Sequence, residues 1–307
     1  MRLLPQTLQL ILLTGLFAAT FNVQATAKTE LLQAKINALV AQELGGINQQ
    51  MGVVINLSGR QRMLTQKMSK EMLLLYHDID IKENRKNLGR SALMFAKTLK
   101  GLINGNKALG LSPTSDKDIL KQMRIVSGLW LSFSKNVLPP IKGAKVDLPF
   151  IKRISKENLP LLEEMNKAVS MYEKVAGSDL NDHAAIINLS GRQRMLTQKM
   201  AKEYLLIAAK VDEEKNKENL EKTIALFHRT LKGLRDGDPS QGLSKTTESI
   251  VLKQLTVIDK LWKEYKLALI TMDLSSKGLK KVADLNMPLL KEMNAAVKMY
   301  EVLSDKE

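Results

Sequence analysis

The chain has 307 residues, of which 44% are hydrophobic and 4% aromatic, with no cysteine and a formal net charge of +15. This length and apolar content exclude a disordered chain and suffice for two domains with a core each. The lack of cysteine excludes disulfides, cysteine-ligated clusters and covalent c-type haem. Many Met, Leu, Lys and Glu residues with few aromatics favour an all-α protein.

Residues 1–27 have the pattern of a secretory signal peptide. Arg2 provides the positive start, residues 8–21 are apolar, and Ala25 and Ala27 fit the small-residue cleavage pattern. The apolar run is shorter than the roughly 20 residues that span a bilayer. We therefore expect export to the periplasm, cleavage after Ala25 or Ala27 and a soluble mature protein, with an uncleaved anchor as the alternative.

The positive charge suggests an anionic partner, but not a nucleic acid. Lysines are spread along the chain and interleaved with Glu, as on a solvated helix face, and no platform of aromatic and basic residues is present.

Two copies of one unit follow the signal peptide. The string INLSGRQRMLTQKM occupies residues 55–68 and returns letter for letter at 187–200. Further on, NLPLLEEMNKAVSMYE from residue 158 matches NMPLLKEMNAAVKMYE from residue 286. The sequence therefore indicates a tandem duplication, with a first domain at 28–177 and a second at 178–307.

Each copy is predicted to form four helices. In the first copy these are a long helix carrying the repeated string, a helix near 84–103, a helix near 117–137 after a polar loop at 104–116, and a last helix near 156–176. Residues 30–44 are also predicted to be helical. We expect an all-α fold of two tandem four-helix-bundle-like domains, packed on each other as a pseudo-dimer.

The repeated string has two faces when it is placed on a helix. One face is apolar and predicts the inside of each bundle: Leu57, Leu64, Met68, Met72 and Leu75. The opposite stripe is small and polar: Ser58, Gly59, Arg62 and Gln66, with Ser190, Gly191, Arg194 and Gln198 in the second copy. Gly within a helix costs about 1 kcal/mol relative to Ala, so this stripe favours a close contact with another helix.

If the two stripes face each other, Arg62 and Arg194 meet across a pseudo-two-fold axis. Two guanidiniums about 6 Å apart repel by roughly 3 kcal/mol at an effective dielectric near 20. Paired planar N–H donors suit a small oxyanion. The alternative is that these arginines pair with Glu or cap carbonyls in an ordinary interface. Arg60 projects elsewhere and is expected at the surface or paired with another helical residue, for instance Glu71.

Nothing in the sequence predicts an enzyme, a metal site or a cofactor. His77, His183 and His228 have no counterpart in the other copy, and no two of them have metal-ligand spacing. No nucleophile, phosphate-binding loop or repeated pair of inward carboxylates accompanies them. We therefore expect no catalytic residues.

The string INLSGRQRMLTQKM, with the later NxPLLxEMNxAVxMYE, resembles the N-terminal domain of type IV pili methyl-accepting chemotaxis transducers, the PilJ-type sensor domain. The resemblance implies a helical bundle that is commonly dimeric. It also implies an anion site like that of the related nitrate and nitrite sensors, where an Arg of the first helix lies in an Arg-Met context. That role falls on the pairs Arg62-Met63 and Arg194-Met195, with Gly59 and Gly191 one turn earlier and Arg60 and Arg192 as secondary residues.

The sequence shows no transmembrane helix, kinase or methylation region after the second copy. We therefore expect a binding component for a small anion, with nitrate or nitrite first among candidates, that reports to a membrane chemoreceptor or sensor kinase. The alternative is an interaction or structural protein that docks on a PilJ-type receptor or pilus-associated complex without a small ligand. One anion per chain would fit a site shared by the two copies, whereas two would require a homodimer.

Overall fold

The structure is a computed structural model that describes residues 23–176 and 181–303, with side chains from 50–176 and 184–303. The chain divides into two units, Met1–Gln49 and Gln50–Glu307. Of the predicted signal peptide, residues 1–22 lie outside the described part. No helix in the described part is long and apolar enough to cross a membrane.

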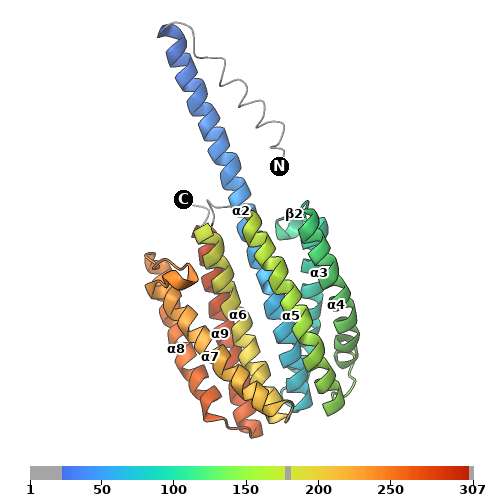
Figure 1. Cartoon of the computed structure of the whole chain (residues 1–307). Coiled ribbons are helices and arrows are strands. Elements are labelled where there is room, and N and C mark those ends of the chain that lie inside the picture. The colour runs from blue at the N-terminus through green and yellow to red at the C-terminus, as the bar shows by residue number, and fades with distance from the viewer. Residues whose placement is uncertain (1–22, 177–180, 304–307) are drawn as a thin grey trace. The chain divides into compact units, whose positions relative to one another are not determined.

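Eight α-helices make up most of the described chain, in two successive sets of four (Figure 1). The first set is α2 (Val23–Tyr76), α3 (Ile81–Asn104), α4 (Lys117–Ile141) and α5 (Leu148–Ala176). The second set is α6 (Asn181–Ala208), α7 (Glu213–Asp236), α8 (Ser249–Thr271) and α9 (Ser276–Leu303). The predicted all-α class in two tandem copies is confirmed, and the predicted helix at 30–44 lies within α2.

The polar loop predicted at 104–116 holds a small antiparallel hairpin. Its strands are β1 (Gly105–Asn106) and β2 (Leu111–Pro113), joined by a 3₁₀ turn, η1 (Lys107–Leu109). The second copy has a 3₁₀ turn at the same place, η3 (Pro239–Gln241). Helix α4 then begins after Asp116, whose carboxylate accepts from the backbone N–H groups of Asp118 and Ile119.

Helix α5 begins earlier than predicted, at Leu148 rather than near 156. The Asp147 carboxylate accepts from the backbone N–H of Phe150 at 2.9 Å, and Pro149 stands in the first turn, where its missing N–H costs nothing. Pro160 falls inside this helix.

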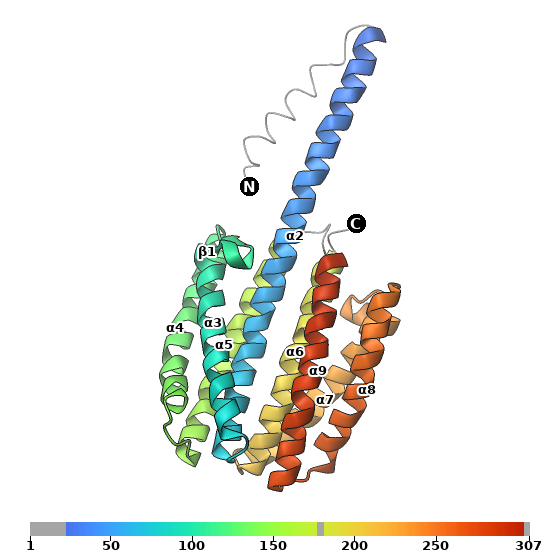
Figure 2. The same ribbon diagram turned by 180° about the vertical axis from the view of Figure 1, so that it is seen from behind.

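Within residues 50–303, the motif-bearing and last helices of the two copies lie in the middle, with the other helices outside them. Both views show α2, α5, α6 and α9 between α3 and α4 on one side and α7 and α8 on the other (Figures 1 and 2). Helices α5 and α6 contact each other across the copies, and α6 packs on both α7 and α9.

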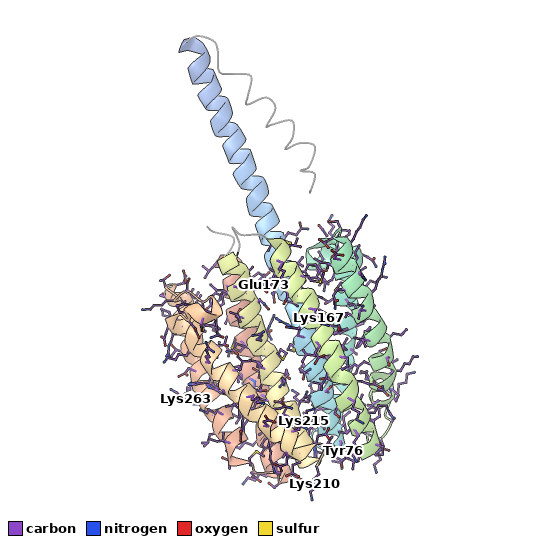
Figure 3. All side chains as sticks on the ribbon, in the orientation of Figure 1. Tyr76, Lys167, Glu173, Lys210, Lys215 and Lys263 are labelled. Carbon is purple, nitrogen blue, oxygen red and sulfur yellow. The ribbon has the colours of Figure 1, made fainter. Side chains whose placement is uncertain are left out.

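Each copy has the same aromatic contacts in its core. The ring centroids of Phe95 and Trp130 lie 4.4 Å apart, as do those of Phe227 and Trp262. The last helix of the first copy turns one stripe of residues inward: Met165, Val169 and Tyr172 are buried and Leu162 is partly buried. Side chains of Lys167, Lys215 and Lys263 extend outward over the surface (Figure 3).

Gly233 in α7 allows the following loop to fold back on the helix. A Cβ on Gly233 would stand 3.0 Å from the Asp238 Cβ and 3.0 Å from the Leu243 Cδ1. Its counterpart Gly101 in α3 has similar neighbours, with the Asn106 Cβ at 3.0 Å. Loop packing therefore explains why both copies have Gly at this position.

Replacing Gly233 with Ala should lower the melting temperature. Overpacking typically costs about 1–3 kcal/mol, and about 1 kcal/mol corresponds to some 2–4 °C for a domain of 150–250 residues. Gly128, exposed in α4 with nothing within 4 Å of a built Cβ, is the control. Gly128→Ala should raise the melting temperature, because Ala favours the helix by up to about 1 kcal/mol. Equal shifts for the two variants, measured by calorimetry, would contradict this account.

Candidate functional site

Both faces of the repeated string are buried. The predicted inward residues Leu57, Leu64 and Met68 are at most 6% exposed, and Arg62 on the opposite stripe is 1% exposed. Arg194 has the same exposure in the second copy. The polar stripe is therefore buried against protein, and the hydrogen bonds described next show that its arginines contact both copies.

Arg62 joins three helices. Its Nη1 donates to the Asn166 Oδ1 of α5 at 2.8 Å, and its Nη2 donates to the Asn188 Oδ1 of α6 at 2.6 Å. Asn166 belongs to the same copy as Arg62, whereas Asn188 belongs to the other. The guanidinium therefore links its own last helix to the other copy's motif helix.

Arg194 makes the equivalent contacts in the opposite direction. Its Nη1 donates to the Asn294 Oδ1 of α9 at 3.3 Å, and its Nη2 donates to the backbone carbonyl of Asn56 in α2 at 3.2 Å. The contact between the copies thus has pseudo-two-fold symmetry, although the distances around Arg194 are longer than those around Arg62.

The two guanidiniums converge over Gly59. A Cβ on Gly59 would stand 3.3 Å from the Nη2 of Arg62 and 3.9 Å from the Nη2 of Arg194, and one on Gly191 would stand 3.1 Å from the Nη2 of Arg194. The glycines therefore leave the space that the guanidiniums fill, and the structure brings the two predicted arginines together.

Burial and like charge both act on this pair. Burial lowers the pKa of Arg194 to about 9, and the positive charges of Arg60 and Arg62 add to the decrease. Burial likewise lowers the pKa of Arg62 to about 9, Arg192 adds to the decrease and Glu173 opposes it. Both side chains remain protonated at neutral pH, so two cations are held side by side within protein.

Among the described residues, two carboxylates approach the arginine pair through hydrogen bonds from asparagines. The Nδ2 of Asn188 donates to the Glu173 Oε2 at 2.7 Å, and the Nδ2 of Asn56 donates to the Glu301 Oε2. Glu173 lies on α5 beside α6 (Figure 3), and burial raises its pKa in spite of the hydrogen bond from Asn188. The groups bound directly to Arg62 and Arg194 are therefore neutral amide and backbone oxygens.

Each arginine also keeps one buried donor without a partner. The Nε atoms of Arg62 and Arg194 have no hydrogen-bond partner in the described structure. A buried donor of a charged group without an acceptor is costly, so each guanidinium retains the capacity to bind an additional acceptor.

The predicted serines and glutamines donate their hydrogen bonds to groups other than the arginine pair. The Ser58 and Ser190 hydroxyls donate to the carbonyls of Ile55 and Ile187 in their own helices, both at 3.1 Å. Gln66 donates to Asn158 at 2.7 Å and Gln198 donates to Asn286 at 2.8 Å. The glutamines therefore fasten the motif helix to the last helix of the same copy. Met63 and Met195 are buried, at 4% and 8% exposure.

The expected pairing of Arg60 with Glu71 is not found among the described residues. The Glu71 carboxylate accepts from Lys67 and Ser91. Burial lowers the pKa of Arg60, and the carboxylate that opposes this decrease is Glu301 of the other copy's last helix. Arg60 is thus half-buried at the contact between the copies and does not serve a pairing within α2.

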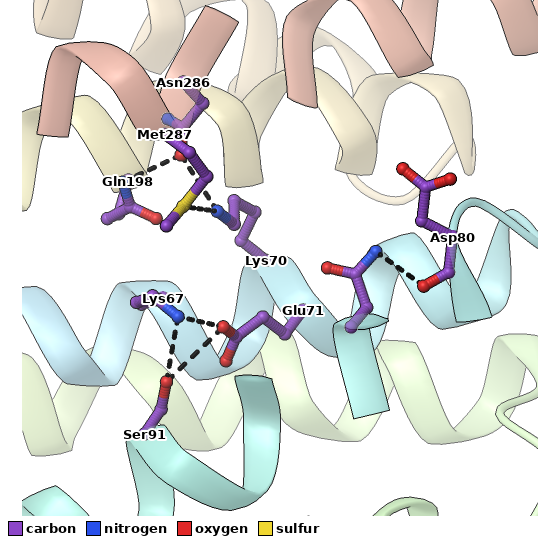
Figure 4. A network of polar contacts seen from close by, with 9 residues as sticks. Lys67, Lys70, Glu71, Asp80, Ser91, Gln198, Asn286 and Met287 are labelled. Carbon is purple, nitrogen blue, oxygen red and sulfur yellow. Dashed lines mark hydrogen bonds and ion pairs between the residues drawn. The ribbon is translucent and has the colours of Figure 1, made fainter. Parts of the chain in front are cut away.

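Sequence reasoning missed the asparagines that hold the arginines and a buried lysine beyond the repeated string. The Lys70 Nζ reaches from α2 to α9, donating to the Asn286 Oδ1 at 2.9 Å and to the Met287 Sδ at 3.6 Å (Figure 4). Its counterpart Lys202 is also buried. A usable signal was present, because these polar residues are identical in the two copies: Asn56 and Asn188, Asn166 and Asn294, Asn158 and Asn286, Lys70 and Lys202.

The histidines play separate local parts. The Nε2 of His77 lies 3.0 Å from the Leu205 carbonyl, and the Trp262 indole N–H donates to the His228 Nδ1 at 3.3 Å. The side chain of His183 lies outside the described residues. In the described part, no group of three or more His, Cys, Asp or Glu is placed to hold a metal.

Replacing Lys70 with Met should stabilise the protein more at pH 6 than at pH 9. Burial lowers the pKa of Lys70 from 10.5 to about 7. Between these values the unfolded chain binds a proton that the folded chain releases, so stability rises with pH across this window. Lys70→Met removes the cost of burying the ammonium group, which is largest below about pH 7.

The measurement is thermal unfolding of wild type and variant at both pH values. Lys97→Met is the control, because Lys97 is exposed on α3 and its replacement should shift the melting temperature by little at either pH. A Lys70→Met shift that is the same at pH 6 and pH 9 would contradict the burial of a charged ammonium group.

A comparison with known protein families matches each of the two copies separately. Residues 47–148 and residues 177–284 each match the PilJ family model, described as Type IV pili methyl-accepting chemotaxis transducer N-term. A search of curated proteins finds no match. The family is one of sensory rather than catalytic domains, which agrees with a role in chemotaxis-type sensing. The two matches together cover more than half of the chain, which therefore belongs to the PilJ family and contains its domain twice.

Proposed function

We propose that this protein is an exported sensor-type binding protein that holds a small oxyanion, nitrate or nitrite, between its two copies. Arg62 and Arg194 bind the anion, and Gly59 and Gly191 leave the room in which the two guanidiniums approach each other. The observation that carries the proposal is the convergence over Gly59 of two buried guanidiniums whose Nη atoms donate to neutral amide and backbone oxygens.

Charge is the first argument for an anion. Two like charges close together in a water-poor interface repel each other, and the nearest hydrogen-bonded carboxylates, Glu173 and Glu301, stand behind Asn188 and Asn56. An anion between the guanidiniums would offset the repulsion and supply acceptors to the unpartnered Nε atoms.

Shape is the second argument. Nitrate is planar with three acceptor oxygens and a single charge, which matches the planar paired donors of guanidinium. The amide oxygens of Asn166 and Asn294 now occupy such donors, so the anion would replace neutral acceptors by charged ones. Charge-assisted hydrogen bonds are roughly twice as strong as neutral ones.

The same contacts suggest how binding would be reported. Each arginine ties its own last helix to the motif helix of the other copy, so an anion that draws the guanidiniums inward would loosen α5 and α9. A shift of these helices would change the outer surface that a membrane chemoreceptor or sensor kinase contacts. Export to the periplasm rests on the signal-peptide pattern at residues 1–27.

The alternative is an interaction protein without a small ligand, docking on a PilJ-type receptor or pilus-associated complex. One observation favours it: all four Nη atoms of Arg62 and Arg194 already donate to groups of the chain itself. In that case the arginines only hold the two copies together, and anions should have no effect on stability beyond that of ionic strength.

Nitrate titration should separate these proposals. Nitrate added at constant ionic strength in place of chloride should raise the melting temperature. A hundredfold excess over Kd should increase the free energy of unfolding by about 2.7 kcal/mol. Calorimetry should show one nitrate site per chain. Arg62→Gln and Arg194→Gln should each abolish the shift. Arg229→Gln is the control, because Arg229 is an exposed residue paired with Asp238.

No shift with nitrate, nitrite or any other oxyanion would refute the anion site and leave the interaction protein as the better proposal. Two sites per chain would show that each copy forms its site with a second molecule.

A further inference from the structure

We infer that a groove between the two copies, formed by α2, α3 and α9, binds an amphipathic organic anion, namely a carboxylate that carries an apolar chain or ring. The groove has a volume of about 470 Å³, within the range of roughly 300–1,000 Å³ typical of small-molecule sites. It is distinct from the space over Gly59, although Arg194 lines both.

The groove is strongly cationic. No Asp or Glu is among its lining residues, and five cations are: Arg60, Lys67, Arg90, Arg194 and Lys298. Two carboxylates stand beside these cations, Glu71 bound to Lys67 and Glu301 bound to Lys298. The positive charges exceed these carboxylates by more than two to one, which favours an anionic group in the groove.

Apolar residues also line the groove, and three of them are methionines. They are Met63, Leu64, Met94, Met287 and Leu290. Met94 is 42% exposed and Met287 is 39% exposed. Unbranched, polarisable Met side chains adapt to apolar ligands of different shape. Cationic and apolar side chains in one groove suit a ligand with one charged end and one apolar end, whereas a fully hydrated ion would leave the apolar residues uncovered.

The other copy offers an internal comparison. A second groove of about 390 Å³ is formed by α6, α7 and α5, with Arg192, Lys199 and Lys222 at the positions of Arg60, Lys67 and Arg90. A carboxylate, Glu163, lines this second groove, and the residue at its position in the other copy is Lys291. Ser170 stands where the first groove has Lys298. The first groove is therefore the more cationic, and we assign the site to it alone.

The test uses octanoate as the probe, with acetate for charge alone and octanamide for the apolar chain alone. Calorimetry on the purified protein should show one octanoate site per chain, with binding that weakens as salt is raised and much weaker binding of both control compounds. Arg90→Glu should reduce octanoate affinity by about tenfold, since it replaces an attraction by a repulsion. Lys222→Glu, at the equivalent position of the second groove, should leave the affinity unchanged.

Arg90 is exposed on α3, so its variant should keep the wild-type melting temperature, and Arg90→Glu should leave any nitrate response intact. Equal effects of Arg90→Glu and Lys222→Glu, or tight binding of octanamide, would overturn the assignment. So would a dimer in analytical ultracentrifugation that Arg90→Glu disrupts, because the groove would then be occupied by a second copy of the chain.

Discussion

The contact between the two copies depends on burying two like-charged guanidiniums side by side. Such an arrangement is unfavourable by itself, because burial removes hydration from each charge and proximity adds repulsion. Hydrogen bonds to amide oxygens offset both effects. Arg62 donates to Asn166 and Asn188, and Arg194 donates to Asn294 and to the backbone carbonyl of Asn56. The glycines of the motif leave room for the guanidiniums, and Glu173 and Glu301 stand behind Asn188 and Asn56, which explains why these positions are identical in the two copies of the motif.

Much of the fold followed from the sequence, because helical periodicity and duplication are strong signals. The apolar face of the motif, the four helices of each copy and the meeting of Arg62 with Arg194 could all be predicted. The start of α5 could not: it was expected near residue 156, whereas the Asp147 cap and Pro149 in the first turn begin the helix at Leu148.

The site itself was only partly predictable. Periodicity shows which residues share a face, but it does not show which residue of another helix stands opposite them. The roles of Asn166 and Asn294 therefore became apparent only in the structure. The serines were assigned to the anion site because they lie on the arginine stripe, yet their hydroxyls bond to carbonyls in the preceding turn, as Ser within helices often does. Lys70 was overlooked among many lysines, although its identity with Lys202 of the second copy is a signal of a shared role.

Covalent linkage of the copies has a consequence for how such a site can change. In a symmetric homodimer every substitution appears twice, so both halves of a shared site must accept it. Here the equivalent positions have already diverged: Arg62 is held at 2.6 and 2.8 Å while the contacts of Arg194 are longer, and Glu163 stands where the other copy has Lys291. A fused pair can therefore give its two halves different tasks, one rigid and one responsive, and can fix the direction in which an asymmetric ligand lies.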